Sequence, residues 1–225
     1  MISIIIPAYI PTRKHHALFI RAIRSLEKQT YKDFEVICVL NGCYTDYGSI
    51  ISSVITDLNI HYKFLEGKTS GAIARNFGIK VSKRKYVAQL DVDDQYHPEK
   101  LEKQIEFLEK NPYIDVLGTL AYSYFEDGKH EAQSSIPDEY STHQQISERL
   151  KVGNCMCHGS IMFKRSVFDK FSYEEKYKPG AIWPSYGVAM WEDLDLWKRM
   201  TSQGVIFQNL NDRLYFHSVG TAVER

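Results

Sequence analysis

Apolar runs of strand length alternate along the chain with stretches in which apolar residues recur every three or four positions, as on one face of a helix. In the N-terminal part, the predicted strands are 2–6, 34–40, 60–65 and 86–90. The predicted helices are 18–26, 50–58 and 73–81. Strands that alternate with helices indicate a parallel sheet with crossover connections, whose ligands lie beyond the carboxyl ends of the strands.

Turn-forming residues set the expected ends of these elements. Pro7 is expected to end the first strand, and Asn41 with Gly42 the second. The polar stretch 12–16 is expected to form a loop before the first helix. The strand at 86–90 is expected to continue directly into an acidic run at 91–94.

The C-terminal part follows the same alternation less regularly. Pro98 is expected in the first turn of a helix that stops at Asn111 and Pro112, and Gly204 is expected to cap a helix over 192–203. A polar segment, 126–140, is expected to be a loop over or beside the site, and 173–184 is irregular and aromatic. Further strands are predicted at 114–125, 158–164, 205–210 and 213–217.

Length and composition predict one compact domain spanning residues 1–225. Lys plus Arg and Asp plus Glu number 28 each, so no net field favours nucleic acid or an anionic membrane, and no nucleic-acid partner is expected. The four cysteines are expected to be reduced thiols, and no stretch has the length of a transmembrane segment or the form of a signal peptide. We therefore expect a cytoplasmic protein.

The acidic run is the first candidate for chemistry. If the strand continues, Asp91 and Asp93 point to one side, with Asp94 just beyond. Carboxylates grouped in this way suit a divalent cation that bridges phosphates. A solvated acidic turn, or a cap for the following helix, explains the same residues equally well.

Each of the other candidate residues has a functional interpretation only if it lies near the acidic run or in the same site. Glu192 and Asp193 begin a predicted helix, where acidic residues already complement the helix dipole, but Asp193 facing a cleft can take a proton from a hydroxyl while Glu192 binds acceptor hydroxyls. His217 can add a nitrogen ligand suited to manganese, or be structural. Arg75 can pair with phosphate or be a surface charge, and Tyr9 can stack on a base or pack.

Taken in order, these segments resemble the inverting glycosyltransferases of family 2, which have the GT-A fold. The resemblance covers nearly the whole chain, and five motifs in the same order carry it. The motifs are ISIIIPAY, SLEKQTYKDFEVICV, GAIARNFGI with YVAQLDVDDQYHPEKLEKQ, WEDLDLWKRM and RLYFHSVG. It implies a single Rossmann-like α/β domain with a mixed, mostly parallel sheet flanked by helices. Residues 1–97 would form the nucleotide-sugar-binding half and residues 98–225 the acceptor-binding and catalytic half.

The resemblance also implies a role for each candidate. Asp91 and Asp93 are similar to the family's DxD pair, with Asp93 the direct ligand of Mn²⁺ or Mg²⁺ and Asp94 adjacent. Asp193 is implied as the base, and His217 as a contact to the metal or diphosphate. The remaining implied contacts to the nucleotide are those of Tyr9 with the base and of Arg75.

The chain departs from the family pattern in three places. Family members have a carboxylate that reads the nucleotide base where this chain has Asn41, whose carbonyl oxygen can still accept from uracil N3–H. The segment after Tyr9 is lengthened by 13–16, which is expected to be a surface loop. The sequence ends soon after His217, so acceptor binding is expected to need a homodimer, a partner or a larger polypeptide.

The resulting hypothesis is a metal-dependent single displacement from a nucleotide diphosphate donor, with UDP-sugar preferred, onto a hydroxyl of a glycan, lipid-linked or protein-linked acceptor. Peripheral attachment at the inner face of the membrane fits such acceptors. Two alternatives are a nucleotidyltransferase, disfavoured because the N-terminal segment has no glycine-rich phosphate loop, and a non-catalytic sugar-nucleotide-binding or scaffolding protein with a degenerate site.

Overall fold

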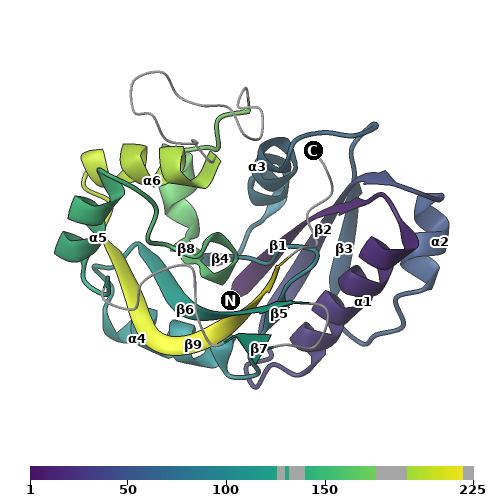
Figure 1. Ribbon diagram of the computed structural model, residues 1–225, viewed down its shortest axis with the longest axis horizontal. Helices are drawn as coiled ribbons and strands as arrows, with labels where there is room; N and C mark the ends of the chain where they lie inside the picture. The colour runs from purple at the N-terminus through teal and green to yellow at the C-terminus, as the bar shows by residue number, and fades with distance from the viewer. Residues whose placement is uncertain (126–129, 132–139, 176–191, 220–225) are drawn as a thin grey trace.

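A mixed sheet with helices on both faces organises the computed structural model, which describes residues 1–125, 130–131, 140–175 and 192–219 (Figure 1). The helices are α1 (Arg13–Glu27), α2 (Tyr47–Ser52), α3 (Gly71–Val81), α4 (Lys100–Lys110), α5 (His143–Leu150) and α6 (Glu192–Ser202). The strands are β1 (Ile2–Ile10), β2 (Phe34–Cys43), β3 (Ile60–Phe64), β4 (Tyr86–Gln89), β5 (Gln95–Tyr96), β6 (Val116–Phe125), β7 (His130–Glu131), β8 (Met162–Lys164) and β9 (Phe207–Val219). Two short 3-10 helices, η1 (His158–Ser160) and η2 (Arg165–Asp169), flank β8.

The strand order β3-β2-β1-β4-β8-β6-β9-β5 joins two parallel groups through one reversed strand. β3, β2, β1 and β4 pair in parallel, as the alternation of strands and helices predicted. β8 lies antiparallel between β4 and β6, and β6 pairs in parallel with β9 along its length. The predicted α/β class with a mixed sheet flanked by helices is confirmed.

Alternate residues of β1 supply two hydrophobic cores, one on each face of the sheet. Ile4 and Ile6 belong to the core that also contains residues of α1, α2 and α4. Ile5 points the other way, into the core shared with α3, α5 and α6. Gly78 allows α3 to approach closely, because a Cβ there would lie 2.5 Å from Ile5 Cγ2.

Two predicted strand ends were wrong. β1 continues through Pro7 to Ile10. β4 pairs with β1 only over Ile2–Ile5, so at Pro7 no β4 residue needs a backbone N–H donor from β1, and the lack of an N–H in proline breaks no hydrogen bond between these strands. β2 continues through Asn41 and Gly42 to Cys43, and the register against β1 shifts there. Gly42 supplies the positive φ of 118° at this irregularity.

The polar stretch 12–16 is not the expected surface loop. Arg13 to His16 form the first turn of α1, because Thr12 caps it: the His15 N–H donates to Thr12 Oγ1 at 3.4 Å. Ser70 caps α3 in the same way. The extra residues after Tyr9 therefore lengthen a helix.

The acidic run also differs from its prediction. β4 ends at Gln89, and the Asp94 N–H donates to the Asp91 carbonyl at 3.2 Å, which makes 91–94 a turn. The carboxylates of Asp91 and Asp93 are therefore not aligned by strand geometry. What each carboxylate faces depends on the surrounding elements.

Several other boundaries differ. The helix predicted at 50–58 is the shorter α2, the helix predicted from Pro98 begins at Lys100, and the strand predicted at 158–164 is η1 followed by β8. The two last predicted strands form one, β9, with register irregularities against Leu120. α5 was not predicted, although Thr142 and Gln145 form a capping box at its start. Most of the predicted loop 126–140 and of the segment 173–184 lies outside the described residues.

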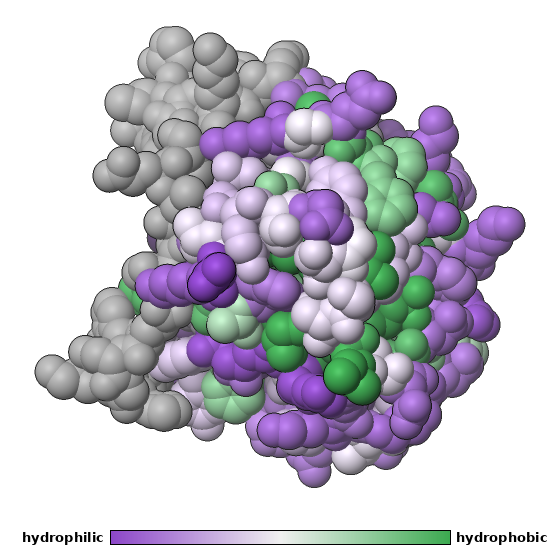
Figure 2. Space-filling view, turned by 90° about the vertical axis from the view of Figure 1, so that its right-hand side faces the viewer, coloured by the Kyte–Doolittle hydropathy of each residue, from purple (hydrophilic) through white to green (hydrophobic). Residues whose placement is uncertain are grey.

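β3 is an edge strand, and Figure 2 views the side of the molecule on which it lies with α2. Phe64, the last residue of β3, is 51% exposed. Lys63 on β3 opposes pairing with another edge.

Within the described residues, no helix has both the length and the apolar character needed to cross a membrane. The predicted division at residues 97 and 98 stays a prediction.

Candidate active site

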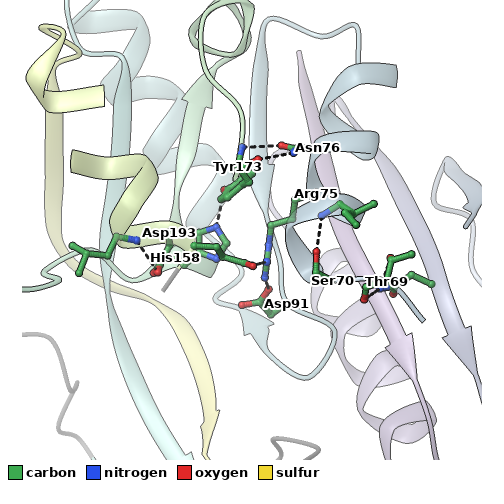
Figure 3. A network of polar contacts seen from close by, with 12 residues as sticks. Thr69, Ser70, Arg75, Asn76, Asp91, His158, Tyr173 and Asp193 are labelled. Carbon is green, nitrogen blue, oxygen red and sulfur yellow. Dashed lines mark hydrogen bonds and ion pairs between the residues drawn. The ribbon is translucent and has the colours of Figure 1, made fainter. Parts of the chain in front are cut away.

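A buried arginine joins three parts of the chain at the carboxyl end of the parallel strands. Arg75, one turn into α3, is 7% exposed. Its Nη2 donates to Asp91 Oδ1 at 2.7 Å, and its Nη1 donates to Glu192 Oε1. The guanidinium lies 5.9 Å from the centre of the Tyr173 ring (Figure 3). Arg75 therefore links the turn after β4 to the first turn of α6.

Gly71 makes this arrangement possible. A Cβ at this position would lie 2.6 Å from Arg75 Nη1 and 3.2 Å from Glu192 Oε1. Both Nη atoms of Arg75 therefore bind carboxylates. The predicted contacts of Arg75 with a phosphate and of Glu192 with acceptor hydroxyls stay predictions. The charge of Arg75 is used to hold the two halves of the site together.

Asp91 is ionised in this network. Burial, the largest single effect, pushes its pKa upward, but the charge and hydrogen bond of Arg75, together with His158 and His217, bring the pKa down to about 2. The Asp91 side chain is 30% exposed. It is therefore a charged carboxylate, partly open to a ligand, at the end of the sheet.

Asp94, which was predicted beside a metal, faces the core. It is 2% exposed; Tyr215 Oη donates to its Oδ2 at 2.6 Å and the Ser218 N–H donates to its Oδ1 at 2.7 Å. Burial, and then the charges of Asp93 and Asp91, raise the pKa of Asp94 well above its usual range. Asp94 fixes the acidic turn against β9 rather than offering oxygens to a ligand.

Asp93 is held through its backbone. Its carbonyl accepts from Arg21 Nη2 at 2.8 Å and from Ser218 Oγ at 2.6 Å, and its side chain is partly exposed. His217 is exposed on β9, beside Ser218. The neighbouring elements thus set the position of Asp93 without burying its carboxylate.

The predicted ligand set for a metal is not assembled by the protein alone. In the part of the chain that the structure describes, no three His, Cys, Asp or Glu side chains group closely enough to hold an ion. Mg²⁺ in enzymes commonly binds through one or two carboxylates and the phosphates of the substrate. Asp91 and Asp93 fit this shared mode, in which a donor diphosphate supplies the remaining oxygens.

Asp193 has the surroundings of a general base. It lies in the first turn of α6, where Oδ1 accepts from the Leu194 N–H at 2.8 Å and Oδ2 accepts from Asn154 Nδ2 at 2.9 Å. Burial raises its pKa from 3.8 to about 6, and the hydrogen bonds and Arg75 oppose that rise. A carboxylate with a pKa near neutrality is a competent proton acceptor.

A second polar pair beside Arg75 was not predicted from the sequence. His158 Nε2 lies 2.7 Å from Tyr173 Oη, and the Tyr173 backbone exchanges two hydrogen bonds of 2.9 Å with the Asn76 side chain (Figure 3). Burial, and then Arg75, lower the pKa of His158 to about 3, so its imidazole is neutral. No local sequence pattern indicates that His158 and Tyr173 belong to the site, because they come together only through packing. The one feature of the sequence that could have pointed to Tyr173 is Asn76, a polar residue next to Arg75.

Tyr9 and Asn41 lie together at the carboxyl ends of β1 and β2. The Asn41 side-chain amide donates to the Thr69 carbonyl at 3.1 Å, and among the described residues its buried Oδ1 has no hydrogen-bond partner. Lys68 Nζ lies 5.0 Å from the centre of the Tyr9 ring. A Cβ on Gly42 would approach Tyr9 to 3.0 Å, so this glycine brings the ring and Asn41 close together.

Comparisons with known proteins agree on the kind of protein that this chain resembles. Residues 3–171 match the model of the family described as glycosyl transferase family 2. The O-antigen biosynthesis glycosyltransferase WbnJ of Escherichia coli is 29% identical over 198 residues, which cover 86% of this chain and 71% of WbnJ. The putative glycosyltransferase EpsE of Bacillus subtilis is 27% identical over 199 residues, covering 86% of this chain and 66% of EpsE.

A likeness among solved structures supports the fold. The structure of Staphylococcus aureus TarS 1-349 in complex with UDP-GlcNAc has a TM-score of 0.71 and 19% sequence identity, over 99% of this chain and 59% of that one. An uncharacterized glycosyltransferase of Rickettsia bellii is 39% identical over 113 residues, which are 50% of this chain and 16% of that protein. The chain thus spans less than two thirds of several of the proteins it matches.

Proposed function

The chain belongs to glycosyl transferase family 2, and from this membership we propose that it moves a sugar from a nucleoside diphosphate donor to a hydroxyl acceptor, with a divalent metal ion and with inversion. The observation that carries the proposal is the buried pairing of Arg75 with Asp91 and Glu192. This pairing holds the acidic turn, suited to a metal-bound diphosphate, against the helix that bears Asp193. The proposed proton acceptor and the proposed leaving-group site are thus linked through Arg75.

We propose a UDP-sugar as the donor. The solved complex of TarS contains UDP-GlcNAc. In this chain the Asn41 amide nitrogen is occupied by Thr69, so the Oδ1 that remains is an acceptor, as uracil N3–H requires. Tyr9, beside it, offers a ring face to the base.

In the proposed reaction, Asp193 accepts the proton of the acceptor hydroxyl while that oxygen attacks the anomeric carbon from the face opposite the diphosphate. Asp91 and Asp93 would hold Mn²⁺ or Mg²⁺, which neutralises charge on the departing diphosphate. Arg75 keeps Asp91 ionised and α6 in place. A single displacement of this kind inverts the configuration at the anomeric carbon.

We propose that the acceptor is a hydroxyl of a growing glycan, free or linked to lipid or protein. WbnJ is named for O-antigen biosynthesis, which supports a polysaccharide context. Because the chain spans only part of many relatives, a further domain, a partner or a second copy can contribute to acceptor binding. A site at the inner face of the membrane remains compatible with this proposal.

The experiment that tests the function is release of nucleoside diphosphate from a panel of nucleotide sugars, with Mn²⁺, with Mg²⁺ and with chelator, for the protein and for Asp93→Ala. Release from one donor that requires metal and falls at least ~100-fold in the variant supports the proposal. Asp212→Ala is the control, because Asp212 lies at the surface and pairs with Lys103. If the protein binds a donor but releases no nucleoside diphosphate with any mixture of acceptors, the result would support a non-catalytic binding protein instead.

Transfer is expected to lose activity below about pH 6. Asp193 acts only as the ionised form, and burial raises its pKa from 3.8 to about 6. The logarithm of kcat/KM should therefore fall with a slope approaching one per pH unit on the acidic side. The measurement is kcat/KM of transfer between pH 4.5 and 8 at saturating metal; an acidic limb near pH 4 would show an unshifted carboxylate.

A further inference from the structure

The loop between α5 and η1 places a neutral amide on the candidate base. Asn154 Nδ2 donates to Asp193 Oδ2 at 2.9 Å, from a position 39 residues earlier in the chain. The other carboxylate oxygen already accepts from the Leu194 N–H at 2.8 Å. Each oxygen of Asp193 thus has one fixed donor, and a carboxylate has further lone pairs that an acceptor hydroxyl can use.

Asn154 is itself held in one orientation. The Met156 N–H donates to Asn154 Oδ1 at 3.0 Å, so turning the amide over would bring two donors together. Cys155 and Met156, which follow it, are fully buried in the core that includes α5 and α6. The amide is therefore presented by a rigid part of the loop.

We propose that Asn154 is a positioning residue that fixes the carboxylate of Asp193 for proton abstraction, a role that rests on the proposed function. The α6 backbone orients only Oδ1, whereas Asn154 fixes the rotation of the whole carboxylate. A base held in one orientation abstracts the proton faster than one that rotates, because small misplacements of a reacting group strongly reduce the rate.

Asn154 also affects how Asp193 titrates. The charged or titratable groups around Asp193 are Glu192 on the same helix, Arg75 from α3 and Tyr173 from the segment after η2. Glu192 raises the pKa of Asp193, whereas Arg75 and the Asn154 amide lower it. Removing the amide removes a donor to the charged form, so the pKa of Asp193 should rise.

The test compares the protein with Asn154→Ala and Asn154→Asp. Titration of the Asp193 carboxyl carbon by NMR, assigned with Asp193→Asn, is expected to show its pKa rising by ~1 unit in Asn154→Ala and further in Asn154→Asp, which adds a like charge. In Asn154→Ala, kcat should fall ~10-fold or more, KM for the donor should change little, and the acidic limb should move upward with the carboxyl pKa. Asn111→Ala, at the end of α4, controls for the loss of a side-chain amide.

The outcomes separate the two proposals. An unchanged Asp193 pKa and an unchanged kcat in Asn154→Ala, with Asp193→Asn inactive, would overturn the role of Asn154 and leave the proposed function standing. Full transfer by Asp193→Asn would overturn the assignment of the base, and with it the positioning role. The NMR titration needs no turnover, so it reports on the contact even if the proposed reaction fails.

Discussion

Replacing Asp193 with Asn is expected to reduce sugar transfer by about 10²–10⁴-fold. The substitution keeps the size of the side chain and removes its capacity to take a proton, and it replaces one of the two oxygens that accept from Asn154 and Leu194 with a donor. Donor binding should remain nearly intact, because the Asp91 turn, Tyr9 and Asn41 come from other elements. The measurements are kcat with a saturating donor, and donor affinity by calorimetry.

Asp195→Asn is the matched control. Asp195 lies on the same helix, is 9% exposed and accepts from Arg199 Nε at 2.8 Å. Its replacement changes the charge of α6 by the same amount and should leave transfer within a few-fold of the original rate. Equal losses in both variants would indicate a general effect of helix charge, and an active Asp193→Asn would require another base.

Replacing Arg75 with Met is expected to destabilise the protein by about 3–5 kcal/mol and to abolish transfer, because it leaves two partly buried carboxylates without their cation. The Arg75 side chain is 9% exposed, and those of Asp91 and Glu192 are 30% and 21% exposed. Urea denaturation at pH 7 measures the free energy of unfolding. A loss below about 1 kcal/mol would mean that solvent, rather than Arg75, stabilises the carboxylates.

The deficit of Arg75→Met should shrink as pH falls. In the original protein, burial raises the pKa of Asp91, but Arg75, with help from His158 and His217, holds it at about 2, below the ordinary value of 3.8. This pairing therefore stabilises the fold above pH 3.8, and the stabilisation is lost toward pH 2. Without Arg75, burial raises the pKa of Asp91 above its unfolded value, and protonation then favours folding. Arg199→Met is the control, since the Arg199 side chain is 32% exposed, against 9% for Arg75, and it pairs with one carboxylate in place of two, so the loss of stability should be smaller.

Much of the fold was predictable because it depends on local patterns. The apolar runs of β1, β2 and β3 and the stripes of α1 and α3 appear directly in the sequence, and their alternation indicated the parallel group of strands. Some of the errors fell where strand pairing overrode a local signal. Pro7 remains within β1 because β4 does not pair with β1 at that position, so no backbone N–H is needed there. One strand, β9, replaces the two predicted strands because β6 pairs with β9 along its whole length.

The candidate site was predictable in part. The sequence placed Asp91, Asp93 and Asp193 beside a sheet end and at a helix start, where the structure also has them, and their roles stay predictions. It could not separate Asp94 from its neighbours, because only β9, through Tyr215 and Ser218, turns that carboxylate into the core. Asn154, His158 and Tyr173 were missed, since nothing near them in the sequence indicates what they contact.

By itself, the sequence determined the α/β alternation, the acidic run that follows β4, the helix that begins with Glu192 and Asp193, and the resemblance to family 2. These depend on residues that are neighbours along the chain. Only the tertiary structure decided that Arg75 binds Glu192, 117 residues away, and that Asn154 binds Asp193. The physical reason is that a buried charge or amide takes the partner that packing brings within about 3 Å, and the order of residues does not specify that partner.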